Sequence, residues 1–424
     1  MSVMSEKTGP LKRSGADPDP PSIAMVLMQY NPYGGYERQA GLLAGAFARM
    51  GYRVTIVSRT AVSEGVAAVD FEKIPVVTVT SWLKVLSFAL RSRSFLRKNS
   101  GAFDLVMAFD RTFIMDIYRA GNACHRAWLR FRRNQGSWRD TISIWCNPLH
   151  WVINAIERSL FRQIVRNNGT VVTLSEMGKR QIQAFYPVSD ACFQIIPPAV
   201  DFSRLEAFRR GGHRERQRRV LGVDPDTVLL LHVGSGFSIK GVGQVLVAIR
   251  RLIGDGLRLH YCIVGNDRKG RRRYGAMARD LQVHHVVTFI DGTEAVGAFY
   301  AAADVFVMPS LFETFGVVVA EAMFFGLPVI VGSGAGAADL VSDEELGVVV
   351  PVPAEAAVLA GAIRATIARE RGWCDEGSLE QKKCRRHQQA QTCAQEKVLH
   401  RYLALIERKL DEKRASRKRY HCDL

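Results

Sequence analysis

Apolar and polar positions follow one another along the chain in blocks that predict alternating strands and helices. Residues 22–28 form a short, uninterrupted apolar run, which predicts a buried strand. A glycine-containing segment follows, then apolar positions at helical spacing up to Met50, and residues 52–58 form a second apolar run. Strand, glycine loop, helix and strand in this order predict a βαβ unit with parallel strands.

The same order of elements begins again after two adjacent prolines, Pro197 and Pro198. Proline fixes φ and lacks an amide donor, so two in a row predict a boundary between domains. Residues 227–253 read as strand, glycine loop and helix, and further runs of valine, isoleucine and leucine follow. Such runs are typical of parallel strands covered on both faces. The pattern predicts two similar α/β domains, with any ligand in the cleft between them, at the carboxyl ends of the strands.

Composition narrows the class of protein. The chain has 424 residues, 47% hydrophobic and 23% charged, as in a globular protein of two or three domains. No stretch reaches the roughly 18 to 20 apolar residues of a membrane span, and the polar N-terminus has no signal-peptide core. We therefore expect a cytoplasmic protein, in agreement with eight scattered cysteines and no C-x-x-C pair. The net charge of +17 calls for an anionic partner: nucleic acid, a membrane surface or a phosphorylated substrate.

Two carboxylates, Glu313 and Glu321, flank an otherwise uncharged segment. Residues 304–310 read as a strand, so Glu313 falls in the loop at its carboxyl end and Glu321 about two turns into the following helix. If both point into the cleft, they can accept hydrogen bonds from two pairs of hydroxyls on one ligand. The simpler alternative is that Glu313 favours the helix dipole and Glu321 is solvated.

A second loop adds positive charge to the same domain. Residues 232–241 leave a strand through Gly234 and Ser235 and reach Lys240 at the start of a helix, which resembles a phosphate cradle. A basic turn with Arg272 and Arg273 follows another strand. A diphosphate fits between them, although an exposed lysine and a solvated turn are the alternatives. No metal site or cofactor is expected.

Together these motifs resemble glycosyltransferase family 4. The resemblance runs from Ser22 to about Glu412 and rests on Glu-x7-Glu, the G…KG loop and the Gly34–Gly35 pair. Within the family, "YNPYGGYERQ" and "VGSGFSIKGVGQ" are most like the lipopolysaccharide core glucosyltransferase I type. The resemblance implies the GT-B fold, α/β with two Rossmann-like doubly wound domains facing across a cleft. The resemblance implies four divisions. Residues 1–21 would be a disordered leader, residues 22–198 an acceptor-binding domain and residues 199–388 a nucleotide-sugar-binding domain. Residues 389–424 would form a C-terminal helix that packs back on the first domain, and a basic tail.

The resemblance also implies a role for each matching residue. Glu321 would hold the ribose hydroxyls, Glu313 the donor sugar and Lys240 the diphosphate. The base would lie near Asp291 and Gly292, and the amides of Phe315, Gly316 and Val317 would meet the diphosphate or sugar. Gly34 and Gly35 would let the first domain approach the donor phosphate. Ser235 stands where the family has arginine, so Arg272 or Arg273 is expected to supply that charge. Asp116 matches the position that faces the acceptor and anomeric carbon, with an ordinary exposed aspartate as the alternative.

The implied reaction is retaining, metal-independent transfer of a hexose, glucose from UDP-glucose, to a heptose of the lipopolysaccharide inner core. The expected catalytic residues are Asp116, Lys240 and Glu313. One alternative is another family 4 transferase with a different nucleotide sugar or a glycolipid acceptor. A sugar-nucleotide epimerase shares the fold, and outside enzymes a non-catalytic membrane or nucleic-acid-binding protein would also use the charge.

The positive charge is concentrated between residues 118 and 166, where nine arginines stand against two acids together with four of the six tryptophans. Arginine with tryptophan is what an anionic bilayer surface selects. Base stacking on nucleic acid has a similar composition, but no recognition fold accompanies it, and some tryptophans are expected in the core. We expect peripheral association with the cytoplasmic face of the inner membrane and no nucleic-acid partner. The expected membrane contacts are Trp128, Arg130, Arg132, Arg133, Trp138 and Trp145.

Overall fold

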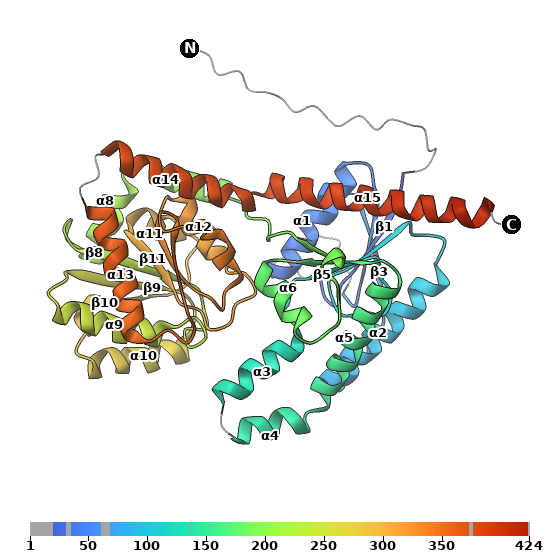
Figure 1. Cartoon of the computed structure of the whole chain (residues 1–424), viewed down its shortest axis with the longest axis horizontal. Coiled ribbons are helices and arrows are strands. Elements are labelled where there is room, and N and C mark those ends of the chain that lie inside the picture. The colour runs from blue at the N-terminus through green and yellow to red at the C-terminus, as the bar shows by residue number, and fades with distance from the viewer. Residues whose placement is uncertain (1–19, 31–34, 61–67, 137, 373–375, 423–424) are drawn as a thin grey trace, which may run out of the picture.

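The computed structural model describes residues 20–30, 35–60, 68–136, 138–372 and 376–422 (Figure 1). Most of the expected leader lies outside these residues. Two parallel sheets, one in each half of the chain, form two α/β domains. The prediction of two doubly wound domains is therefore confirmed.

The first sheet has seven strands in the order β3-β2-β1-β4-β5-β6-β7. β1 pairs in parallel with β2 and β4, so that Ile23 lies opposite both Val54 and Leu105. The strands are β1 (Ser22–Val26), β2 (Arg53–Ser58), β3 (Val69–Lys73), β4 (Leu105–Ala108), β5 (Ile117–Ala120), β6 (Thr170–Thr173) and β7 (Phe193–Ile195). The helices of this domain are α1 (Gly35–Arg49), α2 (Ser81–Lys98), α3 (His125–Gln135), α4 (Trp138–Cys146), α5 (Pro148–Arg166) and α6 (Glu176–Gln183).

The second sheet has six parallel strands in the order β10-β9-β8-β11-β12-β13. The strands are β8 (Val228–Val233), β9 (Leu259–Val264), β10 (Val287–Ile290), β11 (Val305–Met308), β12 (Val329–Gly332) and β13 (Gly347–Val350). The helices are α7 (Ser203–Arg209), α8 (His213–Leu221), α9 (Val242–Gly254), α10 (Arg268–Asp280), α11 (Val296–Ala302), α12 (Val317–Phe324), α13 (Ala356–Arg371) and α14 (Glu376–Ala390).

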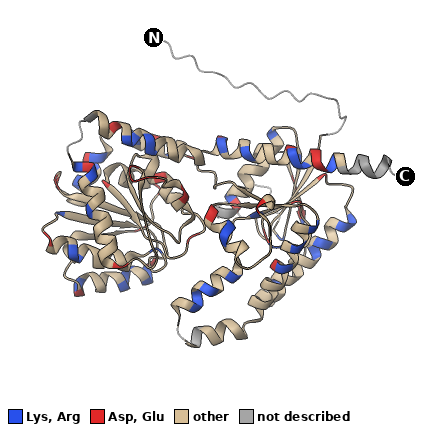
Figure 2. Ribbon diagram, viewed as in Figure 1, with Lys and Arg blue, Asp and Glu red and all other residues tan. Residues whose placement is uncertain are grey.

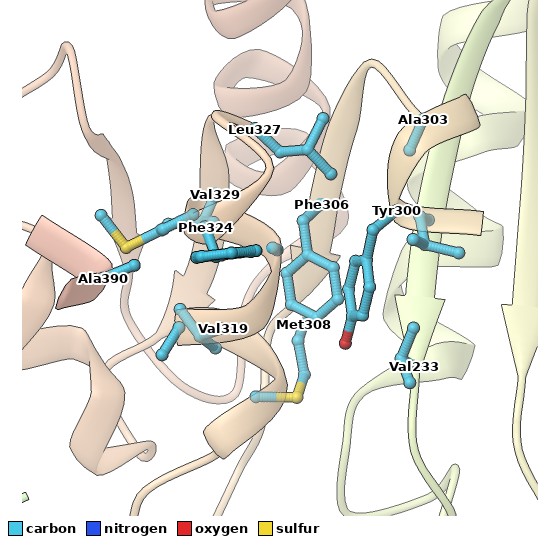
Figure 3. Close-up of a cluster of buried hydrophobic side chains, with 14 of the residues drawn as sticks. Val233, Tyr300, Ala303, Phe306, Met308, Val319, Phe324, Leu327, Val329 and Ala390 are labelled. Atoms are coloured by element: carbon cyan, nitrogen blue, oxygen red, sulfur yellow. The ribbon is translucent and has the colours of Figure 1, made fainter. Parts of the chain in front are cut away.

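The core of the second domain explains why α12 lies where it does. Figure 3 shows the Phe306 and Met308 side chains of β11 between Tyr300 of α11 and Val319 of α12, and all four residues are buried. Fully burying a large apolar side chain stabilises the fold by about 1.5–3 kcal/mol, so these contacts hold α12 firmly against the sheet. The loop between β11 and α12, which carries Glu313, is thereby fixed at both ends.

The last helix, α15 (Gln395–Cys422), leaves the second domain and packs on the first (Figure 1). Its apolar face contributes Val398, Tyr402 and Ile406 to the core of the first domain. The buried Arg119 donates a hydrogen bond from Nε to the Tyr402 hydroxyl at 3.0 Å. Along the described part of the chain, no helix combines the length and the apolar character needed to cross a membrane.

Candidate active site

A cavity of about 420 Å3 lies between the two domains, within the size range of small-molecule sites. Both domains and the segment that joins them line it. Its lining includes Arg38, Gln39, Arg204, Ser235, Asn266, Gly292, Val317, Val318 and Glu321. Gln39 holds the joining segment in place, because its side-chain amide donates to the Ala199 carbonyl at 2.6 Å and accepts from the Ala199 amide at 2.9 Å.

Glu321 reaches the wall of this cavity from α12 and is only 4% exposed. The Tyr300 hydroxyl donates to its Oε2 at 2.9 Å, and Arg204 pairs with its Oε1. The alternative of a solvated Glu321 is therefore wrong. The pKa of Tyr300 is raised, mainly by burial and further by the nearby charge of Glu321, so its hydroxyl stays protonated and can donate. Each carboxylate oxygen has two acceptor positions, which leaves capacity for ligand hydroxyls.

Glu313 and Lys240 meet in the loops of neighbouring strands. Lys240 Nζ donates to Glu313 Oε2 at 2.9 Å, and the lysine side chain is 15% exposed. The Glu313 amide donates to Gly334 O at 2.8 Å, and Gly336 N donates to Glu313 O at 3.1 Å, so both sides of its backbone are held. Since Lys240 is mostly buried and paired, the alternative of a merely exposed lysine is wrong.

Glycine allows the Lys240 loop to lie close to the Glu313 loop. Gly241 has a φ of 82°, and a Cβ there would come within 2.6 Å of the Pro309 carbonyl oxygen. Gly234 has a φ of 133°, and a Cβ there would come within 2.9 Å of Lys240 Cε. A side chain at either position would displace the lysine or separate the loops.

Ser235, Asn266 and Gly292 link the ends of three neighbouring strands. Ser235 Oγ accepts from Asn266 N at 3.2 Å, and Asn266 Oδ1 accepts from Gly292 N at 2.8 Å. All three line the cavity, whereas the neighbouring Asp291 is exposed and pairs with Arg271 at 3.1 Å. Asn266 is thus a cavity residue that sequence reasoning did not identify.

The amino end of α12 faces the same cavity through Val317 and Val318. Gly316, at a φ of 97°, turns the chain into the helix, and the Phe315 ring is buried below it. The first amides of a helix have no partner within it and carry a partial positive charge. This end of α12 can therefore receive an anionic group beside Glu321.

The arginines at the cavity are not the ones that the sequence predicted. Arg272 and Arg273 lie exposed on α10 and do not line the cavity, and the Arg273 guanidinium lies 5.5 Å from the centroid of the Tyr274 ring. Arg38 of α1 and Arg204 of α7 line it instead. Arg204 lies in the segment that follows the double proline, and this position was the only sequence signal for its role.

Asp116 is also misplaced by the sequence prediction. It precedes β5, at the amino end of the sheet, where its Oδ2 accepts from Val106 N at 2.8 Å and pairs with Lys413 of α15 at 2.8 Å. The cleft lies at the opposite, carboxyl ends of the strands. The expected place of Asp116 facing an acceptor is therefore wrong, and its contacts are those of a residue that anchors α15. Gly34 lies outside the described residues, and Gly35 begins α1.

Helices α3 and α4 extend from the first domain, with basic residues along α3 and few on α4 (Figure 2). Trp138 and Trp145 are 69% and 73% exposed, and Arg130 and Arg133 are exposed on α3. Trp151, which was not among the expected membrane contacts, is 58% exposed on α5.

Trp128 has different surroundings from the other tryptophans. It is half-buried, and its ring lies 5.5 Å from that of Phe131 and 5.2 Å from that of Phe312 in the second domain. Its expected contact with a membrane is therefore replaced by a contact between domains. Phe312 directly precedes Glu313, so α3 touches the loop that carries the candidate sugar-binding carboxylate. In the described part of the chain, no three metal-ligating side chains lie close enough to hold an ion.

Models of two glycosyltransferase families match the chain, Glycosyltransferase Family 4 over residues 33–204 and Glycosyl transferases group 1 over residues 213–383. The chain is 27% identical over 333 residues to the lipopolysaccharide glucosyltransferase WaaG of Escherichia coli (strain K12), covering 78% of this chain and 85% of the relative. It is 32% identical over 217 residues to a D-inositol 3-phosphate glycosyltransferase of Geodermatophilus obscurus. That match covers 49% of this chain and 47% of the relative.

Solved structures share the fold. A crystal structure of WaaG matches with a TM-score of 0.68 and 24% identity, covering 89% of this chain and 98% of that one. A sucrose-phosphate synthase from Thermosynechococcus elongatus matches with a TM-score of 0.66 and 19% identity, covering 92% and 98%. The two family models together span both domains and the cavity between them. The chain therefore belongs to the group 1, family 4 glycosyltransferases and has the GT-B fold.

Proposed function

We propose that this glycosyltransferase transfers glucose from UDP-glucose to a heptose of the lipopolysaccharide inner core, with retention of configuration. The observation that carries the proposal is a pair of carboxylates in the segment that follows β11: Glu321, buried on the cavity wall and held by Tyr300, and Glu313, bonded to Lys240 at 2.9 Å in the loop before α12. The name of the WaaG relative supports the choice of glucose and of a lipopolysaccharide acceptor.

Different residues bind the donor and stabilise the leaving group. Glu321 accepts hydrogen bonds from the ribose hydroxyls, and Glu313 accepts them from the hexose. Lys240 and the amino end of α12 stabilise the negative charge that develops on the diphosphate as the sugar–oxygen bond breaks. Because these groups supply positive charge themselves, we expect activity to survive a metal chelator.

A second candidate is transfer of a different sugar to another phosphorylated or glycolipid acceptor. It is favoured by the 32% identity to a D-inositol 3-phosphate glycosyltransferase. The donor is tested by measuring the melting temperature of the protein with a panel of nucleotide sugars, since a ligand that binds only the folded state raises it. We expect UDP-glucose to give the largest rise. A larger rise with another nucleotide sugar would replace the proposed donor.

We also propose that the exposed surface of α3 and α4 associates with an anionic membrane. Each basic residue near such a surface contributes about 1 kcal/mol before screening, and exposed tryptophans anchor at headgroup depth. We expect the protein to sediment with anionic but not with zwitterionic vesicles, and Arg130→Gln/Arg132→Gln/Arg133→Gln to partition about tenfold less. The matched control is Arg216→Gln/Arg219→Gln/Arg250→Gln, three exposed arginines of the second domain. Tight binding to nucleic acid at physiological salt, without binding to vesicles, would contradict the proposal.

The contact between α3 and Phe312 gives a further prediction. Phe312→Ala removes aromatic contacts at 5.0 Å to Phe131 and 5.2 Å to Trp128, which are worth about 0.5–1.5 kcal/mol. We expect kcat to fall about two- to tenfold while the affinity for UDP stays unchanged, because Phe312 does not line the donor cavity. Phe103→Ala, a half-buried control at the amino end of β4, should leave kcat unchanged. An unaltered kcat in Phe312→Ala would mean that the contact does not position Glu313.

A further inference from the structure

A separate groove of about 340 Å3 lies on the first domain, between α5, the first turn of α3 and the turn that follows α6. It shares no residue with the donor cavity. Its charged lining residues are all arginines, with no acid among them. The full lining is Arg126, Arg158, Phe161, Arg162, Val165, Arg166, Phe185, Tyr186 and Pro187.

Within the described part of the chain, none of these four arginines has a carboxylate at ion-pair distance. The acid on the same helix, Glu157, is buried and serves other groups: it accepts from Arg111 Nε at 2.7 Å and from the Tyr186 hydroxyl at 3.0 Å. A concave surface lined by one sign of charge concentrates counter-ions. Guanidinium groups bind both phosphate and carboxylate with two parallel hydrogen bonds, but the tetrahedral oxygens of a phosphate can be shared among several arginines, which suits a groove lined by four of them.

The floor of the groove is rigid and aromatic. The Arg126 guanidinium lies 5.1 Å from the centre of the Phe185 ring and 5.9 Å from that of Tyr186. The Phe161 and Tyr186 rings are 4.6 Å apart, and the hydrogen bond from Tyr186 to Glu157 fixes the ring further. Arg126 is therefore held in one orientation before a ligand arrives, which lowers the entropic cost of binding.

The position of the groove on α5 identifies the kind of ligand. Trp151, Arg158, Arg162 and Arg166 are spaced seven, four and four residues apart, so they share one stripe of the helix. Trp151 is exposed and contacts Trp145 edge to face at 6.4 Å. Val165 is an exposed apolar side chain at the rim. The stripe thus joins an anion site to the tryptophans proposed to meet the membrane.

We propose that the arginine groove binds the phosphate headgroup of an anionic membrane lipid, one lipid per chain. The volume accommodates a headgroup but not its acyl chains, which would leave at the Arg158 end of the groove, toward Trp151 and Trp145. This inference rests on the proposed membrane association and adds a discrete site to a surface that otherwise binds through charge and exposed tryptophans.

The test uses dihexanoyl phosphatidylglycerol below its micellar concentration, titrated calorimetrically into the full chain. We expect one site per chain and an affinity at least about tenfold lower in Arg158→Gln/Arg162→Gln/Arg166→Gln. Arg216→Gln/Arg219→Gln/Arg250→Gln removes the same charge from the second domain and should bind as the wild type does. Dihexanoyl phosphatidylcholine and inorganic phosphate should bind much more weakly. The rise in melting temperature with UDP-glucose confirms that each variant is folded.

Three results would overturn the inference. Equal losses in both triple variants would show that net charge, and not the groove, attracts the lipid. Inorganic phosphate that binds as tightly as the lipid would show an anion site without lipid recognition. The third result is a wild type that fails to bind the short lipid and still sediments with anionic vesicles and binds UDP-glucose. That result would show that the groove is not a lipid site and would leave the proposed function intact.

Discussion

A Lys240→Ala variant is expected to lose about 100- to 1,000-fold in kcat/KM for hexose transfer. Lys240 bonds to Glu313 at 2.9 Å across two loops and lies in the domain that presents the amino end of α12 to the cavity. Its charge would be most valuable when the diphosphate leaves, because negative charge develops on the leaving group at that point. Loss of the lysine also leaves Glu313 without its partner.

Binding measurements separate the role of Lys240 at phosphate from a general effect on the fold. Calorimetry should show a large loss of affinity for UDP and little loss for uridine. Lys397→Ala, an exposed lysine of α15, serves as the control and should behave as the wild type. Equal losses for UDP and uridine would mean that Lys240 does not touch phosphate.

The second large effect is expected at Glu321. Glu321→Ala should weaken donor binding by about 1–3 kcal/mol, because the proposed charged acceptor for the ribose hydroxyls is lost while Arg204 and Tyr300 remain. Unlike the lysine variant, it should weaken uridine and UDP alike. The measurement is calorimetric affinity for both ligands, with Glu344→Ala as an exposed control. Unchanged uridine affinity in a folded Glu321→Ala variant would remove Glu321 from the site.

Three residues of the candidate site could be predicted from the sequence because their signals are local. Glu313, Glu321 and Lys240 each follow an apolar run that had to be a buried strand, and parallel strands bring their carboxyl ends to one edge. The same reasoning predicted the strand, helix and strand that open the first domain and the strand, glycine loop and helix at residues 227–253 of the second. It did not find the short strands β3, β5 and β7. β5 contains the charged residue Arg119, which is buried and bonds to Tyr402 of α15.

The errors share a physical cause, which is that their partners lie far away in the chain. Asp116 was predicted to face the cleft, but it lies at the amino end of β5 and pairs with Lys413, which is far away in the sequence. Arg204 and Glu321 form an ion pair although they are 117 residues apart in the sequence, and no rule of residue spacing predicts such a contact. Trp128 is covered by Phe312 of the other domain, so composition alone counted it among the exposed tryptophans.

Contact between α3 and Phe312 also connects the two ends of the proposed mechanism. The helix that carries the exposed arginines packs on the residue before Glu313, and its first turn contributes Arg126 to the arginine groove. Helix α3 would therefore contact the membrane on one side and the loop that carries Glu313 on the other. Phe312→Ala tests the side of α3 that faces the donor-binding domain, and Arg130→Gln/Arg132→Gln/Arg133→Gln tests the side proposed to meet the membrane.

The configuration of the product distinguishes retaining transfer of glucose from UDP-glucose from every alternative that inverts the anomeric carbon. The measurement is NMR spectroscopy of the glycan formed when wild-type protein, UDP-glucose and a heptose-terminated lipopolysaccharide core acceptor are incubated together, with Lys240→Ala as the matched control. We expect an α-linked glucose on heptose, formed with release of one UDP and greatly slowed in the variant. A β-linked product, or no transfer to heptose under conditions in which UDP-glucose binds, would contradict it.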